Sequence, residues 1–226
     1  MLLVAFIACG QIDSEDLPTA EIIANLSAIS YGNNLKVTAD LRDGEGTFAN
    51  SVILGDSDLL EAGNGIEFQT LSLNKNFGRD NYSADFPPPT QETEFFLRFK
   101  RENFNSATEN CTTIPSPFEL TFPYEYAHFR RSDSISVTWT PVVTDSLMEI
   151  SVSGDCVRDY TIEAFDSGVY VLPSSLWFYS DDDDSFDCHI DIEVSRLHKG
   201  TIDRNWFSGE FRGSQTRTVA VTIDMD

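Results

Sequence analysis

Apolar and polar residues alternate along most of this chain with a period of two. In the segment 35–42, for example, Leu35 and Val37 alternate with Lys36 and Thr38. Successive side chains of a β-strand point to opposite faces, so this period is typical of half-buried strands. The alternation recurs at residues 95–99, 118–122, 135–139, 148–152, 188–194 and 219–223.

Turn-forming clusters rich in Gly, Asn, Asp and Ser separate these segments, at residues 43–46, 63–65 and 153–155. No long helical period occurs, and no internal apolar segment has transmembrane length. Short strands at this spacing predict an all-β chain built from antiparallel sandwiches rather than a βαβ fold.

A domain boundary is expected near residues 123–133. The pair Phe122-Pro123 ends one run of strands, and the polar segment 130–133 precedes the next. Each side then holds about 100 residues, the usual size of an Ig-like sandwich. We therefore expect two consecutive domains, 20–122 and 123–226, after a signal segment at 1–9 and a tether at 10–19.

The segment Ser134–Pro141 resembles the second strand of a fibronectin type III domain. In that family a buried Trp follows alternating apolar residues and a Pro ends the strand, as Trp139 and Pro141 do here. The similarity covers about eight residues, and a cysteine pair stands where the family has none. The resemblance implies Ig-like architecture without implying membership of the family.

Residues Met1–Ala8 form an uncharged apolar run that ends at Cys9-Gly10. A bilayer takes about 20 residues to cross, so this run matches the hydrophobic part of a signal peptide instead. Its end resembles the bacterial lipobox, in which a small residue precedes a Cys that becomes lipidated. Phe6 departs from that pattern, and no Lys or Arg precedes the run, so we expect the true start to lie upstream of Met1.

The resemblance implies that Cys9 is acylated and that the polar segment after it is a tether. The alternative is a buried first strand in which Cys9 only packs. With this end and its Ig-like modules, the chain resembles uncharacterised lipoproteins of Gram-negative bacteria. Gly10 directly after the Cys, rather than Asp, implies attachment to outer-membrane lipid.

The chain carries 15 Lys and Arg residues against 37 Asp and Glu residues, which gives a formal net charge of -22. Such a field repels phosphate backbones, so nucleic acid is excluded as a partner. It favours cations and basic partners, or simply solubility.

Three cysteines remain beyond Cys9, and an exported protein folds in an oxidising compartment. Cys156 follows a turn and Cys188 opens a strong strand pattern in the same domain, so we predict a disulfide between them. Its loop of about 33 residues is expected to contribute about 3–4 kcal/mol. Cys111 is left unpaired. No metal site follows from these cysteines, because no C-x-x-C and no neighbouring His pair occurs.

Asp187, His189, Asp191 and Glu193 are expected on the solvent face of one strand, after the acidic run 181–184. Carboxylates in such a ladder can bind a divalent cation, although a solvated strand face is the simpler interpretation. The segment Asp56–Glu67 departs from a calcium-binding loop, because Leu60 and Glu61 replace a ligand and the turn Gly. We predict no metal and no cofactor.

Catalytic signatures are missing from the sequence. It has no G-x-S-x-G, no H-E-x-x-H and no Gly-rich phosphate loop. Trp177 and Tyr179, in the aromatic cluster 177–179 beside the acidic run, are the candidates for stacking on a sugar ring. The alternative places these aromatic residues at a strand end with one side in the core.

These observations predict a non-enzymatic lipoprotein of the cell envelope that scaffolds or binds another envelope component, a protein or a glycan. The first alternative is a carbohydrate-binding module, for which a groove lined by Trp177 or Tyr179 would be the sign. The second is a hydrolase with an unrecognised site, for which buried, converging carboxylates and His residues would be the sign.

Overall fold

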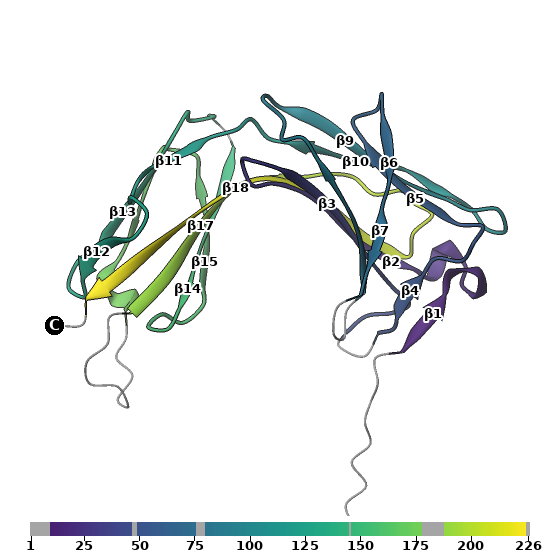
Figure 1. Ribbon diagram of the computed structural model, residues 1–226, viewed down its shortest axis with the longest axis horizontal. Coiled ribbons are helices and arrows are strands. Elements are labelled where there is room, and N and C mark those ends of the chain that lie inside the picture. The colour runs from purple at the N-terminus through teal and green to yellow at the C-terminus, as the bar shows by residue number, and fades with distance from the viewer. Residues whose placement is uncertain (1–9, 47–48, 76–79, 145, 178–187, 225–226) are drawn as a thin grey trace, which may run out of the picture. The chain divides into compact units, whose positions relative to one another are not determined.

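A computed structural model describes residues 10–46, 49–75, 80–144, 146–177 and 188–224. The chain divides into two compact units (Figure 1). Unit 1 comprises Met1–Pro88, Glu92–Ile114 and His198–Gly213, and unit 2 comprises Pro89–Gln91, Pro115–Leu197 and Ser214–Asp226. Both units are made of mostly antiparallel strands, so the predicted all-β sandwich class is confirmed.

Unit 1 has two sheets. The order in the first is β1 (Gln11–Asp13), β4 (Ser51–Ile53), β3 (Leu35–Arg42), β2 (Ile23–Ser30) and the start of β18 (Ser208–Asp224), with β8 (Asn81–Phe86) pairing β3 and β7 (Ser72–Asn74). The order in the second is β10 (Ala107–Ile114), β9 (Thr93–Lys100), β5 (Leu59–Gly63) and β6 (Phe68–Thr70).

One core lies between these sheets and contains side chains from both, such as Val37 of β3 and Leu97 of β9. The predicted face of residues 35, 37, 39 and 41 is buried along β3, and β9 buries Phe95, Leu97 and Phe99 in the same alternation. Period-two patterning therefore identified both the strands and their inward faces.

The C-terminal half of the chain completes the core of unit 1. Trp206 and Phe211 belong to it although they follow β17 (Cys188–Lys199) in sequence. The Trp206 ring stacks on Phe99 at a centroid distance of 5.2 Å, and its indole N–H donates to Asn110 Oδ1 at 2.8 Å. Asp203 adds two bonds, accepting from the backbone N–H groups of Thr108 and Glu109 at 2.8 and 3.0 Å.

Unit 2 also has two sheets. The first contains β11 (Glu119–Phe122), β13 (Ile135–Thr140) and β16 (Val169–Leu172). The second contains β18, β17, β14 (Leu147–Gly154) and β15 (Tyr160–Phe165), with β12 (Ala127–Arg130) parallel to β18. If β13 to β18 are lettered B, C, C′, E, F and G, the pairing B–E and the order G-F-C-C′ are those of an Ig-type sandwich.

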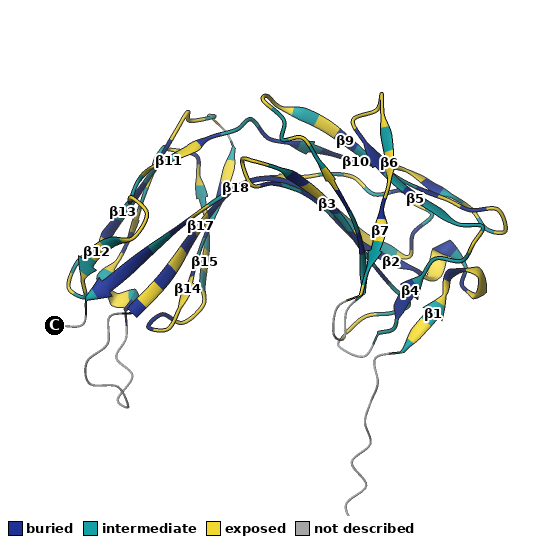
Figure 2. Ribbon diagram, viewed as in Figure 1, coloured by how far each residue is buried: buried dark blue, intermediate teal, exposed yellow. Residues whose placement is uncertain are grey.

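The core of unit 2 confirms the strand faces expected from the sequence. Trp139 of β13 is buried at 3% exposure, as the fibronectin-like segment implies. Along β17 buried and exposed residues alternate from Cys188 to Glu193, which Figure 2 shows as alternating dark blue and yellow. Met148, Ile150 and Val152 of β14 are buried in the same way.

The division into units differs from the expected boundary between residues 122 and 123. The structure passes from unit 1 to unit 2 at Ile114–Pro115 and returns residues 198–213 to unit 1. Phe118, the first residue of the alternating segment 118–122, packs in the core of unit 2. This segment therefore belongs to unit 2.

Helical structure is confined, in the described ranges, to three short 3-10 turns: η1 (Ser14–Asp16), η2 (Thr19–Glu21) and η3 (Ser174–Leu176). None of the described helices has the length and hydrophobicity to span a membrane.

Candidate functional site

Several predicted site residues lie outside the described residues. These are Cys9, the expected lipidation site, Tyr179, and the acidic residues 181–184 and 187. Their roles remain predictions.

Trp177 is described, and its indole is packed inside unit 2. The residue is 3% exposed, and Nε1 donates to the carbonyl oxygen of Asp133 at 3.1 Å. Its ring face is covered, so it cannot stack on a sugar in this structure. The interpretation of residues 177–179 as a strand end packed on the core is the one that fits Trp177.

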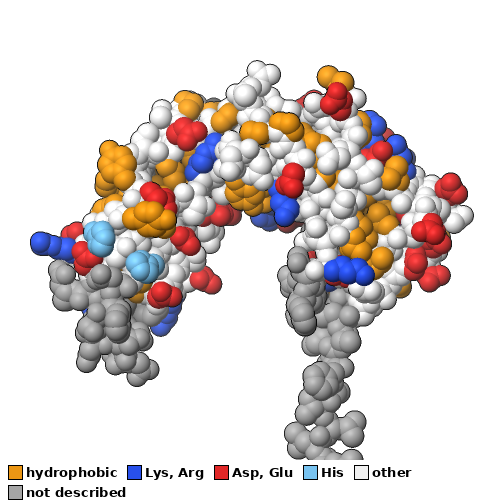
Figure 3. Space-filling view, in the orientation of Figure 1, with side chains coloured by type: hydrophobic (Ala, Val, Ile, Leu, Met, Phe, Trp, Pro, Cys, Tyr) orange, Lys and Arg blue, Asp and Glu red, His pale blue; other side chains and the backbone are white. Residues whose placement is uncertain are grey.

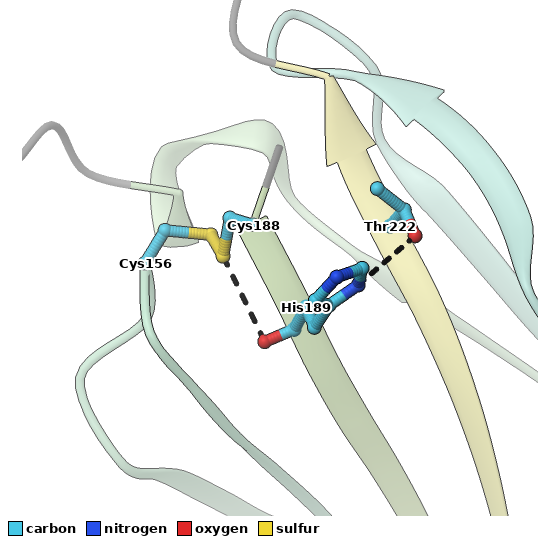
Figure 4. Close-up of a disulfide and its surroundings, with 4 residues drawn as sticks. All are labelled: Cys156, Cys188, His189 and Thr222. Carbon is cyan, nitrogen blue, oxygen red and sulfur yellow. Dashed lines mark hydrogen bonds between the residues drawn. A yellow bond between two sulfur atoms is a disulfide. The ribbon is translucent and has the colours of Figure 1, made fainter. Parts of the chain in front are cut away.

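Cys156 and Cys188 form the predicted disulfide (Figure 4), with Cα atoms 5.9 Å apart. It joins the connection after β14 to the first residue of β17, wholly within unit 2. Cys111 of unit 1 carries a free thiol, as expected. Burial, and then the nearby Glu94 carboxylate, raise the pKa of this thiol, so Cys111 is a weak nucleophile at neutral pH.

The ladder on β17 has the predicted orientation. His189, Asp191 and Glu193 are exposed on its outward face. His189 Nδ1 lies 3.2 Å from the Thr222 hydroxyl of β18, as Figure 4 shows. Among the described residues no three His, Cys, Asp or Glu side chains converge as metal ligands.

The ladder continues as an acidic surface across β14 and β15. Glu149 of β14 lies directly opposite Glu163 of β15, and Glu193 of β17 lies opposite Ser151, two residues from Glu149. Opposite residues in an antiparallel pair have side chains about 5 Å apart, so these carboxylates repel one another. We name this set the acidic rows: Glu149, Glu163, Asp191 and Glu193.

Like charges lie close together in the acidic rows. Partial burial, and then the charge of Glu149, raise the pKa of Glu193. No ion pair that the described part of the chain makes involves a carboxylate of the acidic rows. A cation bound from outside would therefore relieve repulsion that no ion pair among the described residues relieves.

An apolar row borders the acidic rows on the same face. Leu147 of β14 pairs with Phe165 of β15 on one side and with Leu197 of β17 on the other. Phe165 is 77% exposed and Leu147 is 45% exposed. The sequence carries a signal for this row, because Phe165 is an apolar residue at a position that alternates in step with the polar residues Thr161 and Glu163.

Each unit contains a buried ion pair whose charged groups bind other parts of the same unit. In unit 1, Arg101 pairs with Asp58 and donates to the carbonyl oxygens of Ser14 and Leu17. In unit 2, Arg196 pairs with Asp166 and has its remaining donors on backbone carbonyls. These are satisfied structural pairs, so neither offers a free acid or base for catalysis.

Two exposed tyrosines form a second surface feature of unit 2, between β11 and β12. Tyr124 and Tyr126 are 72% and 71% exposed. Tyr124 packs edge-on against Phe122, with ring centroids 5.8 Å apart. Tyr126 has φ 60°, a left-handed conformation that costs a bulky residue energy. The alternation of apolar and polar residues gave no signal for it.

Comparison with known proteins does not identify a family for this chain. No family model and no curated protein matches the chain. Among solved structures, the Yersinia pseudotuberculosis adhesin InvE matches at 14% identity over 91% of this chain and 59% of its own, with a TM-score of 0.26. This chain therefore spans less than two thirds of that structure.

The fibronectin(III)-like modules of Clostridium thermocellum CbhA match at 11% identity over 90% of this chain and 91% of their own, with a TM-score of 0.24. The titin I-band fragment I67–I69 matches at 10% identity over 88% of this chain and 65% of its own, with a TM-score of 0.25. At these TM-scores the matches carry no argument, and the Ig-like description of unit 2 rests on its strand order.

Proposed function

We propose that this chain is a non-enzymatic lipoprotein of the cell envelope, anchored through acylated Cys9 in the outer membrane, that binds another envelope component. The observation that carries the binding role is the exposure of large apolar side chains on unit 2, of which Phe165 is 77% exposed. Figure 3 shows hydrophobic side chains in orange beside acidic ones in red on the surface. Exposed apolar residues grouped on one surface favour partner binding.

The anchoring part is supported by the resemblance of residues 6–9 to a lipobox. Cells expressing the full chain or Cys9→Ser are labelled with a radioactive fatty acid and fractionated. The full chain should carry label and sediment with membranes, and Cys9→Ser should carry none and be soluble. Equal membrane association and no label in either protein would contradict the anchor.

The binding part is tested by cross-linking in intact cells. A cross-linked adduct of defined mass is expected for the full chain and should be weakened by Phe165→Ser. Ile66→Ser is the matched control, because Ile66 of unit 1 is 87% exposed and lies in the other unit. An adduct that survives Phe165→Ser and is lost with Ile66→Ser would place binding on unit 1.

Glycan binding is the second candidate, supported by Tyr124 and Tyr126 rather than by Trp177. Exposed tyrosine rings offer flat faces that stack on pyranose rings. Affinity electrophoresis in gels containing a neutral β-glucan should retard the full chain, and Tyr124→Ala with Tyr126→Ala should abolish the retardation. Unchanged mobility of the full chain in such gels would count against this candidate.

A further inference from the structure

The strand β15 is an edge of its sheet. The order of the sheet ends at β14 and β15, and among the described residues nothing pairs with the other side of β15. Its pairing with β14 is regular from Leu147–Phe165 to Val152–Tyr160, without a bulge. An edge strand presents unpaired backbone N–H and C=O groups, which can accept a further strand.

Proteins usually protect such an edge with charged side chains, Lys above all, with Pro, with a bulge or with a very short strand. The six residues of β15, Tyr-Thr-Ile-Glu-Ala-Phe, include neither Lys nor Pro, and their one charged residue is Glu163, which would attract a basic strand. The two edges of the facing sheet, β16 and β11, have four residues each, and the pairing of β11 contains a bulge. The strand β12 carries Arg130 and also has four residues. Among these edges of unit 2, β15 offers the longest regular backbone without a basic or bulged residue.

The inward side of β15 is incompletely covered. Tyr160, Ile162 and Ala164 pack on the core of unit 2 but are only partly buried. Added apolar side chains beside them would remove more of this surface from water, which stabilises a complex by about 25 cal/mol per Å².

The outward side of β15 determines the charge of a suitable strand. Thr161, Glu163 and Phe165 point outward, and Glu163 belongs to the acidic rows, which make no ion pair in the described part of the chain. Basic side chains on an added strand would be attracted there, and the aliphatic stem of one of them would pack on Phe165.

We propose that β15 of unit 2 is a docking edge that accepts an extended strand from a basic protein partner, with apolar residues facing inward alternating with Lys or Arg facing outward. This mode is β-augmentation: backbone hydrogen bonds supply affinity and alternate side chains supply specificity. It rests on the proposed binding function and names the chemistry of the partner.

The test uses the full chain with Cys9→Ser, to remove the anchor, and a synthetic peptide in which Lys and Val alternate over ten residues. Fluorescence anisotropy should show saturable binding that weakens as salt is raised. Hydrogen exchange should show new amide protection within residues 160–165. A peptide in which Glu replaces Lys should not bind.

Glu163→Lys should weaken binding about tenfold or more, because it reverses the charge at the edge. Glu67→Lys in unit 1, at another exposed residue, changes the net charge equally and should leave the affinity unchanged. Phe165→Ser, which leaves the charge untouched, should also weaken binding and keeps the test valid if Glu163→Lys fails to fold.

Three results would overturn the proposal: no saturable binding of the Lys/Val peptide, protection outside β15, or equal weakening by Glu67→Lys and Glu163→Lys. The last would show attraction by net charge alone. If the peptide fails while the anchored chain still gives its cross-linked adduct, the binding function stands and uses another surface.

Discussion

Arg196 and Asp166 form an ion pair inside unit 2, with Arg196 Nη2 and Asp166 Oδ2 2.7 Å apart and side chains 1% and 0% exposed. The Asp166 carboxylate also accepts from Trp139 Nε1 at 2.6 Å and from the Val143 N–H at 3.0 Å. Arg196 donates further to the carbonyl oxygens of Ser116 and Pro141, both at 2.7 Å. One pair thus joins β13, β17 and three connecting segments of this unit.

Asp166→Asn is expected to destabilise unit 2 strongly. It leaves the Arg196 guanidinium buried without its counter-charge, which costs about 3–5 kcal/mol in comparable pairs. Hydrogen exchange in a urea series should show the loss in residues 135–197, with little change in residues 23–100. Asp155→Asn, on the exposed turn after β14, is the control and should be neutral. A neutral Asp166→Asn would contradict this account.

Removal of the disulfide by Cys156→Ser with Cys188→Ser should lower the stability of unit 2 by about 3–4 kcal/mol, because a loop of this length is no longer closed in the unfolded chain. Urea denaturation followed by hydrogen exchange separates the units. Thiol titration of the denatured, unreduced Cys9→Ser protein should return a single thiol, that of Cys111. Three reactive thiols would mean that the bond does not form.

A fragment that ends at residue 122 is expected not to fold by itself. It contains the strands once expected to form domain 1 but lacks residues 198–213, including Trp206 and Phe211 of the unit 1 core. In the full chain, Trp206→Ala should destabilise unit 1 by about 3–5 kcal/mol. Circular dichroism and thermal melting test both, with exposed Phe207→Ala as the control. A 10–122 fragment that melts cooperatively would contradict the requirement of unit 1 for residues 198–213.

Glu193→Gln is expected to raise the melting temperature at pH 7 by about 1 °C, since like charges across strands cost a few tenths of a kcal/mol. The pKa of Glu193 is raised in the folded protein, so the ionised form is less favourable there than in the unfolded chain. The difference should appear as pH rises above the ordinary Glu pKa of about 4.3 and vanish below it. Melting curves from pH 3 to 8 decide this. An effect that persists at pH 3 would have another cause.

The amino-acid sequence alone determined the class of fold and the inward face of several strands. Period-two alternation depends on the local geometry of a strand, so β3, β9, β13, β14 and β17 were identified with their buried residues. The Cys156–Cys188 bond followed from compartment chemistry and from placing both cysteines in one domain. The strand faces follow from residues close together in sequence, and the disulfide follows from the chemistry of two cysteines.

Tertiary structure decided what depends on contacts between distant residues. Trp206 donates a hydrogen bond to Asn110, which lies 96 positions earlier in the sequence. No local pattern indicates that residues 198–213 complete the core of unit 1. Trp177 is buried in the core of unit 2, and its indole N–H donates to the carbonyl oxygen of Asp133, which lies 44 positions away in sequence. The docking edge at β15 likewise appears only with the strand order, because the unpaired side of a strand is set by which strands pair with it and not by its own residues.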